Sequence, residues 1–120
     1  MAGRIALIIE DNLQIADIYS ATLEMCHYNI EVITNGRVAL ERLGNFTPDL
    51  IILDMNLPEV SGHYIYKEIR AESRLDNTPV IISTANALVA GMLSNDLTSI
   101  DRIMVKPVGP KDLIEVVQNL

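Results

Sequence analysis

Residues 49–58 read DLIILDMNLP, a short apolar run that ends in an acid and a proline-containing loop. Four consecutive aliphatic residues at 50–53 are typical of a strand buried on both faces, the environment found in parallel sheets. Other short apolar runs occur at residues 5–9, 30–34, 80–83 and 103–105. The sequence therefore predicts five strands, the third of which delivers Asp54 at its carboxyl end.

Helical patterns separate these runs. Asn12 is placed to cap a first helix, in which apolar residues near helical spacing are expected to face the core: Ile15, Ile18, Leu23 and Met25. Later helices are expected at residues 38–43, after Gly62, at residues 88–97 and from Pro110, the last with Leu113, Ile114, Val117 and Leu120 on its inner face. Alternating strands and helices predict an α/β fold, a doubly wound parallel sheet covered on both faces and joined by right-handed crossovers.

The composition fits one domain over residues 1–120. Hydrophobic residues make up 49% of the chain but aromatic residues only 4%, so an aliphatic core is expected. A net charge of −7 without a basic run argues against a nucleic-acid surface. The single cysteine, Cys26, is interpreted as a small apolar residue late in a helix rather than a reactive thiol. A lone thiol, no leader-like segment and no apolar stretch of membrane-spanning length indicate a cytoplasmic protein.

Polar residues follow four of the predicted strands. Glu10 and Asp11 follow the first, Asp54 ends the third, Thr84 follows the fourth and Lys106 the fifth. In a doubly wound sheet the carboxyl ends of the strands form the binding crevice, so these side chains are expected to meet there. Three carboxylates repel one another unless a cation lies among them, and oxygen ligands without Cys or His favour Mg²⁺. A carboxylate nucleophile beside a metal, an ammonium and a hydroxyl indicates phosphoryl transfer.

Each of these residues alone has an ordinary explanation. Asp11 can act as part of a helix cap, Asp54 as a turn residue at a strand end, and Lys106 as part of an exposed connection. The fold argument brings all of them to one crevice without using their chemistry. This convergence favours a functional site over the separate explanations.

Four motifs together resemble the receiver domain of bacterial two-component response regulators, the CheY-like family. They are residues 7–12, residues 49–58 with Gly62, residues 79–85 and residues 105–107. The resemblance covers essentially the whole chain, because the motifs occur in this order and at these intervals. It implies a flavodoxin-like fold, in which three α/β/α layers enclose a five-stranded sheet of order 2-1-3-4-5.

The resemblance also implies roles at the site. Asp54 looks like the phosphoacceptor, while Glu10 and Asp11 look like the acidic pair that holds Mg²⁺ together with Asp54. Asn56 would add its backbone carbonyl as a further metal ligand.

Two further side chains and the partners follow from the same resemblance. Thr84 is similar to the family's switch hydroxyl, and Lys106 to the lysine that pairs with the phosphoryl group. The phosphoryl group would come from a histidine kinase or a histidine phosphotransfer protein. The resulting conformational change would control a downstream effector protein or an output domain. No enzymatic activity beyond self-phosphorylation and autodephosphorylation is implied.

Some features depart from the family pattern and leave alternatives open. Ile103 stands where the family often has Tyr or Phe. Residues 87–93 carry no charge, and Gly91 weakens a helix by about 1 kcal/mol relative to Ala. That segment is either a helix largely in the core or a partner face, for example for a homodimer through the fourth helix. Two other functions are a docking scaffold that is never phosphorylated and a haloacid-dehalogenase-like phosphatase, although Asn56 replaces the second Asp of that enzyme motif.

Overall fold

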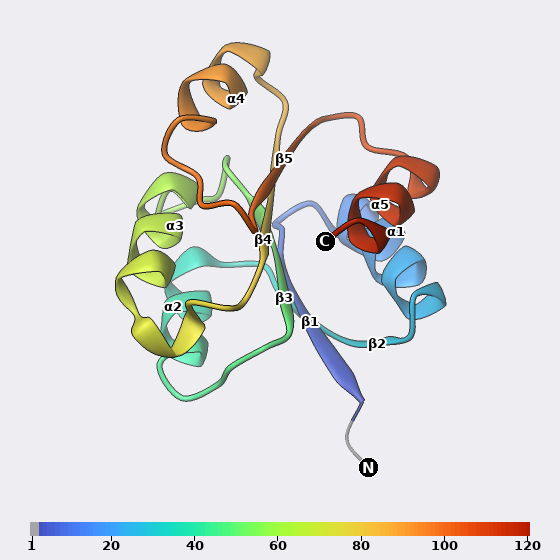
Figure 1. The fold of residues 1–120 in the computed structure, drawn as a ribbon, viewed down its shortest axis with the longest axis horizontal. Helices are drawn as coiled ribbons and strands as arrows, with labels where there is room; N and C mark the ends of the chain where they lie inside the picture. The colour runs from blue at the N-terminus through green and yellow to red at the C-terminus, as the bar shows by residue number, and fades with distance from the viewer. Residues whose placement is uncertain (1–2) are drawn as a thin grey trace.

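The computed structural model describes residues 3–120; Met1 and Ala2, the first residues of the predicted domain, lie outside the described residues. The strands are β1 Arg4–Ile9, β2 Tyr28–Ile33, β3 Leu50–Asp54, β4 Val80–Thr84 and β5 Arg102–Val105. The helices are α1 Leu13–Met25, α2 Gly36–Leu43, α3 Gly62–Ala71, α4 Ala87–Leu93 and α5 Pro110–Gln118, with a 3₁₀ turn η1 Ser73–Leu75. Strands and helices alternate along the chain, as the hydrophobic runs predict (Figure 1).

The five strands form one parallel sheet in the order β2-β1-β3-β4-β5 (Figure 1). This order confirms the predicted flavodoxin-like, doubly wound α/β fold. The register also aligns the carboxyl ends of neighbouring strands, because Asp54 pairs with Ser83 and Thr84 pairs with Val105. The polar residues at the strand ends therefore arrive at the same edge of the sheet.

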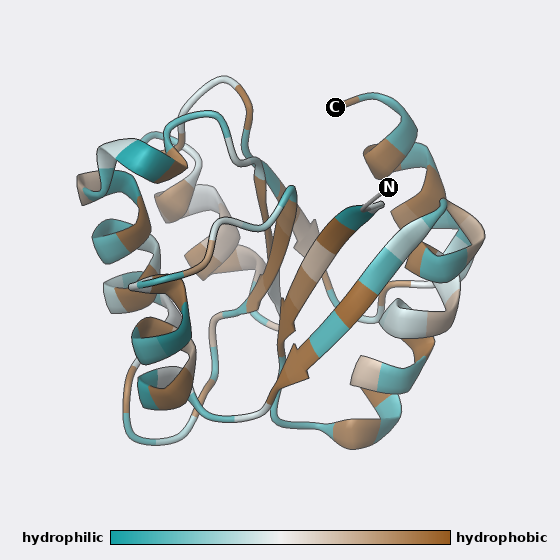
Figure 2. Ribbon diagram, turned by 90° about the horizontal axis from the view of Figure 1, so that it is seen from below, coloured by the Kyte–Doolittle hydropathy of each residue, from teal (hydrophilic) through white to brown (hydrophobic). Residues whose placement is uncertain are grey.

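Helices cover both faces of the sheet, with α2, α3 and α4 on one side and α1 and α5 on the other (Figure 1). Along β3, Leu50 and Ile52 join the core under α1 and α5, whereas Ile51 and Leu53 join the core under α2 and α3. This alternation explains why the run has no polar residue, since each side of the strand is covered. The inner strands are accordingly hydrophobic along most of their length, whereas the edge strand β2 alternates hydrophobic and hydrophilic residues (Figure 2).

The face that helix α1 turns to the sheet matches the predicted one only in part, because Leu23 and Ile15 pack on the core but Ile18 and Met25 do not. Ala16, Tyr19 and Leu23 are buried, whereas Ile18 and Met25 are 46% and 70% exposed. The buried residues are separated by three and four positions, so they form one stripe along the helix. The expectation that Ile18 and Met25 face the core is therefore wrong, because they lie outside this stripe.

The core is also less purely aliphatic than the composition suggests. Tyr19, Tyr28 and Tyr66 are all buried. Tyrosine can be buried when its ring packs in the core and its hydroxyl finds a polar partner. Tyr66 meets this condition by donating to Asp101 Oδ2 over 2.6 Å.

Two helices end earlier than predicted. Helix α4 ends at Leu93 rather than at residue 97, and the hydroxyl of the next residue, Ser94, donates to the Gly91 carbonyl. Cys26 is the C-cap of α1 rather than a residue inside the helix. The following residue, His27, has φ of 70°, a left-handed conformation that cannot continue a right-handed helix.

Helix α5 also differs in part from its predicted inner face. Leu113 is buried, and Ile114 and Val117 are partly buried. Leu120 lies beyond the end of the helix and is 43% exposed, so its expected place in the core is wrong. Across residues 3–120, no helix is both long and apolar enough to cross a membrane.

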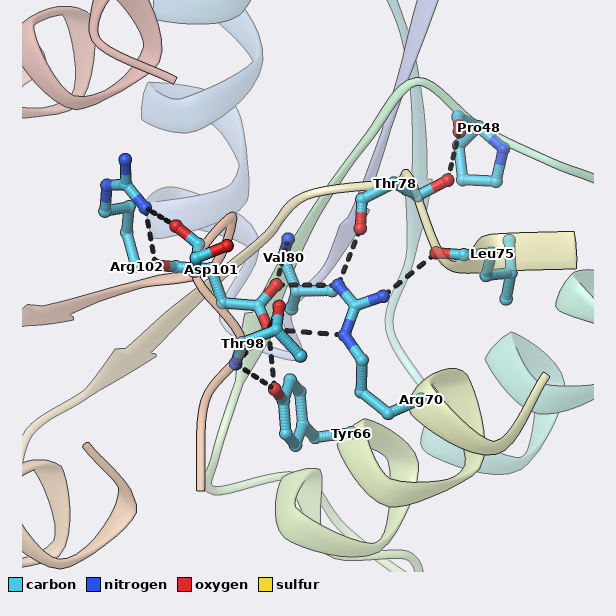
Figure 3. Close-up of polar contacts among 10 residues, drawn as sticks. Pro48, Tyr66, Arg70, Leu75, Thr78, Val80, Thr98, Asp101 and Arg102 are labelled. Atoms are coloured by element: carbon cyan, nitrogen blue, oxygen red, sulfur yellow. Dashed lines mark hydrogen bonds and ion pairs between the residues drawn. The ribbon is translucent and has the colours of Figure 1, made fainter. Parts of the chain in front are cut away.

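A polar network lies where β4 and β5 begin, at the edge of the sheet opposite the strand ends that carry the predicted site. Figure 3 shows its residues. Asp101, just before β5, is buried and pairs with Arg70 at the end of α3, with 2.6 Å between Oδ1 and Nη2. The same carboxylate accepts from the Tyr66 hydroxyl, from the Thr98 hydroxyl over 2.8 Å and from the Val80 N–H over 3.0 Å. The network therefore ties the segment before β5 to α3 and to the start of β4.

Candidate functional site

Two buried carboxylates lie at the carboxyl end of the central strands. Along β1 and β3, every second side chain packs in the core under α1 and α5, and Glu10 and Asp54 continue that alternation. Their relative exposures are 0% and 1%. Glu10 Oε2 also accepts the N–H of Asn12, and Asn12 in turn caps α1 through the N–H of Ile15. The start of α1 thus fixes one acid of the site.

Lys106 joins the two carboxylates. Its Nζ lies 2.9 Å from Glu10 Oε1 and 3.2 Å from Asp54 Oδ1. Burial lowers the pKa of Lys106, but the hydrogen bond to Glu10 and the charges of Asp54 and Glu10 outweigh this and raise it above its usual value. The ammonium therefore remains charged at neutral pH and compensates part of the buried negative charge.

The charge in the site is not balanced by Lys106 alone. Burial and the charge of Asp54 raise the pKa of Glu10, with burial the larger cause, whereas hydrogen bonds from Lys106 and the N–H of Asn12 lower it. The net effect raises this pKa from 4.5 to about 7. Two carboxylates sharing one ammonium thus leave one of them poorly stabilised as an anion. An additional cation would relieve this.

Asp11 completes an acidic cluster with the geometry of a metal site. One carboxylate oxygen each from Glu10, Asp11 and Asp54 lie within 4.8 Å of one another. Asp11 is exposed, so the cluster opens to solvent on one side. Hard oxygen donors around a partly open position are what Mg²⁺ prefers, since it keeps several waters. These residues therefore fit a magnesium ion.

Asn56 lies next to this cluster. It is exposed, and its backbone N–H donates to Asp54 Oδ1 over 3.2 Å. The use of its carbonyl as a metal ligand stays a prediction. Asp54 Oδ1 thus receives hydrogen bonds from Asn56 and from Lys106, while among the described residues no donor reaches Oδ2. This second oxygen is therefore the less engaged of the two.

Thr84 lies at the end of β4 but does not contact the carboxylates by a hydrogen bond. It is buried, and its hydroxyl accepts the N–H of Asn86, which caps α4. Its carbonyl accepts the N–H of Lys106 over 2.7 Å, so the two residues are held together through the backbone. Its role as a switch hydroxyl stays a prediction. Ile103, on β5, packs as a partly buried side chain against the core under α2 and α3.

Gly62 allows the loop after β3 to close over the end of that strand. Its N–H donates to the carbonyl of Met55 over 3.2 Å, which brings the start of α3 back to the end of β3. A Cβ atom at this position would collide with the carbonyl oxygen of Asp54 and lie 2.6 Å from Met55 Cα. Glycine is therefore required here by space, because the backbone of Asp54 lies against it.

Sequence reasoning missed two hydroxyl residues beside the site, Tyr19 on α1 and Ser83 on β4. Both are buried. Ser83 is the polar residue inside the predicted fourth strand, and its position opposite Asp54 depends on the sheet register. Tyr19 was overlooked because its neighbours Ile15 and Ile18 offered a plausible apolar face in its place.

Comparison with known proteins agrees with this geometry. A family model described as the response regulator receiver domain matches residues 6–118. The chain belongs to this family. Among curated relatives, the receiver domain is 33% identical over 107 residues to the probable transcriptional regulator ycf27 of Guillardia theta, covering 89% of this chain and 41% of that protein. It is 29% identical over 114 residues to the DNA-binding dual master transcriptional regulator RpaA of Synechocystis, covering 95% of this chain and 47% of that protein.

Solved structures show the same fold. The chemotaxis response regulator CheY4 of Vibrio cholerae aligns with a TM-score of 0.86 at 26% identity, covering 98% of each chain. The receiver domain of the sensor histidine kinase PA1611 of Pseudomonas aeruginosa aligns with a TM-score of 0.84 at 28% identity, covering 98% of this chain and 97% of that one. That structure has a magnesium ion coordinated in its active site cleft. The receiver domain described here spans less than half of the two curated relatives.

Proposed function

We propose that this receiver domain is a phosphorylation switch in which Asp54 accepts a phosphoryl group beside a Mg²⁺ ion held by Glu10, Asp11 and Asp54. The observation that carries the proposal is the buried Glu10–Lys106–Asp54 arrangement at the mouth of the acidic cluster. Such a site positions an acceptor carboxylate and supplies positive charge to phosphoryl oxygens, which is most of what phosphoryl transfer requires.

The proposed reaction uses the chain's own groups as follows. Asp54 Oδ2 attacks the phosphorus of a phosphohistidine, the new O–P bond forms as the N–P bond breaks, and the leaving imidazole takes up a proton. Lys106 and the Asn56 N–H hold Asp54 through Oδ1, so the other oxygen faces the incoming group. The bound metal would neutralise phosphoryl oxygens during transfer. Thr84 would then donate its hydroxyl to the phosphoryl group after releasing Asn86.

The partners follow from the family. The phosphoryl donor is a histidine kinase or a histidine phosphotransfer protein, and the target is an effector protein or an output domain. We propose no enzymatic activity beyond the domain's own phosphorylation and dephosphorylation, and a cytoplasmic location in which Cys26 stays reduced. A homodimer through α4 is part of the proposal, because Leu88 and Met92 are 80% and 75% exposed on that helix.

Covalent phosphorylation at Asp54 is the first testable consequence. Incubation with acetyl phosphate and Mg²⁺ should add one phosphoryl mass to the parent domain and none to Asp54→Asn, because the amide is not a nucleophile for this transfer. Intact mass measurement provides the readout. Asp49→Asn is the matched control, since Asp49 lies before β3 and its carboxylate accepts the Ile5 N–H at the opposite edge of the sheet. Equal labelling of Asp54→Asn and the parent would exclude Asp54 as the acceptor.

Stabilisation of the fold by Mg²⁺ is the second testable consequence. A ligand that binds only the folded state at about ten times its Kd adds roughly 1.4 kcal/mol to the free energy of unfolding. Thermal melts with and without Mg²⁺ should show this gain in the parent and a smaller one in Asp11→Asn. Asp17→Asn, an exposed acid on α1 outside the cluster, should keep the full gain. If millimolar Mg²⁺ at low salt left the melting temperature of the parent unchanged, the metal site would be refuted.

A further inference from the structure

Two buried hydroxyls beside the site have no partner. Tyr19 Oη and Ser83 Oγ lie in side chains that are 2% and 1% exposed, and neither has a hydrogen bond within residues 3–120. A buried hydroxyl without a partner destabilises the fold, so natural proteins contain few of them. Such an exception beside a reaction site calls for a physical reason.

Both hydroxyls lie on the face of the sheet that carries the carboxylates. Ser83 is paired with Asp54 in the register of β3 and β4. Helix α1 begins at the crevice, and helical side chains lean toward the start of their helix, so the Tyr19 phenol leans toward the site. Burial raises the pKa of Tyr19, and the Ser83 hydroxyl and the charge of Lys106 act against this. The two hydroxyls are therefore neighbours, although their geometry falls short of a hydrogen bond.

Tyr19 and Lys106 also line the same small cavity. Its volume is about 120 Å³, and Ile15, Ile18 and Pro107 complete most of its wall. Apart from Lys106, the side chains around this cavity are apolar or, in Tyr19, aromatic with one hydroxyl. Apart from Lys106, Tyr19 is thus the one residue lining this cavity whose side chain carries a possible acceptor for the ammonium.

Lys106 needs such an acceptor when a metal binds. Its ammonium carries three hydrogens, and two of them are directed to Glu10 and Asp54. A divalent cation on Glu10 repels the ammonium and competes for the same carboxylate, so the bond to Glu10 is weakened. A largely buried ammonium without replacement partners is strongly unfavourable.

We propose that Tyr19 is a positioning residue for Lys106, its hydroxyl accepting a hydrogen bond from the ammonium when a divalent cation binds Glu10. This inference rests on the proposed metal site. The unpaired hydroxyl destabilises the metal-free domain and gains a partner on metal binding. The Tyr19 hydroxyl therefore favours the metal-bound state, in which Lys106 remains directed at Asp54.

Tyr19→Phe tests this, because the substitution keeps the ring and removes only the oxygen. The metal-free variant should melt higher than the parent, by about 3 °C, since an unpaired polar group is gone. Its dissociation constant for Mg²⁺, measured by titration, should rise about tenfold, since a hydrogen bond to a charged group is lost. Labelling of Asp54 at sub-saturating Mg²⁺ should slow in proportion.

Three control variants separate this from a packing effect. Tyr66→Phe removes a hydroxyl that is paired with Asp101, so it should melt lower and bind Mg²⁺ as the parent does. Ser83→Ala, whose hydroxyl is not on the cavity wall, should leave the dissociation constant within about twofold. In a Lys106→Met background, adding Tyr19→Phe should change nothing in Mg²⁺ binding, because the donor is absent.

Several results would overturn the inference: a lower melting temperature for metal-free Tyr19→Phe, unchanged Mg²⁺ affinity, or an equal loss of affinity without Lys106. If Ser83→Ala weakened Mg²⁺ binding as much as Tyr19→Phe does, the proposed role would not be specific to the Tyr19 hydroxyl. A parent that binds Mg²⁺ but is never labelled would defeat the proposed phosphorylation while the affinity readout still decides on Tyr19. A parent that does not bind Mg²⁺ would defeat both.

Discussion

Arg70→Met is expected to lower the free energy of unfolding by about 3–5 kcal/mol, the usual range when one partner of a buried ion pair is removed. The substitution leaves the Asp101 side chain, which is 0% exposed, without its cation. It also removes donors to the carbonyls of Leu75 and Thr78, which Arg70 reaches over 2.9 and 2.6 Å. Denaturant unfolding of parent and variant measures the loss directly.

Arg42→Met is the matched control for this prediction. Arg42 pairs with Glu31 over 2.8 Å, but the two side chains are 38% and 34% exposed. Solvent screens such a pair, so we expect a loss of at most about 1 kcal/mol. If Arg70→Met were no more destabilising than Arg42→Met, the buried network would not contribute as described.

The same network makes stability depend on pH in a defined direction. Burial raises the pKa of Asp101, but hydrogen bonds from Arg70, Tyr66, Thr98 and the Val80 N–H outweigh it, and the net pKa lies below the usual 3.8. The folded state therefore binds this proton more weakly than the unfolded state. The stabilisation is complete above the unfolded pKa and is lost as pH falls through the folded one. Because protonation of Asp101 removes the charge that Arg70 compensates, the stability lost in Arg70→Met should shrink as pH falls through the folded pKa, and denaturant unfolding at neutral and acidic pH measures this.

Gly62→Ala is expected to have the second large effect, about 1–3 kcal/mol or more of lost stability together with slower labelling of Asp54. The added methyl group would meet the backbone of Asp54 and Met55, not a side chain that can turn away. Either the start of α3 or the end of β3 must move. Thermal melting measures the first effect, and the rate of phosphoryl labelling measures displacement of the acceptor.

At Gly91, the same glycine-to-alanine substitution is expected to stabilise the domain. Gly91 lies within α4, and nothing lies within 4 Å of a Cβ atom built there. Alanine should stabilise that helix by up to about 1 kcal/mol. A destabilised Gly91→Ala variant, or a Gly62→Ala variant that melts like the parent, would show that the space around each glycine does not decide the effect of an added methyl group.

The fold and the charged site could be predicted because their signals are local. Each strand is a contiguous run, and each of Glu10, Asp54 and Lys106 directly follows or ends one. The Asp101 network could not be predicted in this way, because Arg70 and Tyr66 lie 31 and 35 residues from Asp101 in the chain.

The helix faces were harder to predict for a different reason. Ile18 and Tyr19 are adjacent in sequence, and the more hydrophobic Ile18 is the exposed one, because packing against the sheet decides which of them is buried. The contribution of Tyr19 to the site depends on that choice. It also depends on the sheet register, which brings Ser83 beside Asp54.

The ion pair between Lys106 and Glu10 joins residues 96 positions apart, one following the first strand and the other following the last. During synthesis from the amino terminus, both buried acids leave the ribosome well before their counter-ion does. A nascent chain that stops after β4 thus contains both buried acids but lacks the ammonium that pairs with them. Under the proposed function, we therefore expect such an incomplete chain to accept a phosphoryl group poorly.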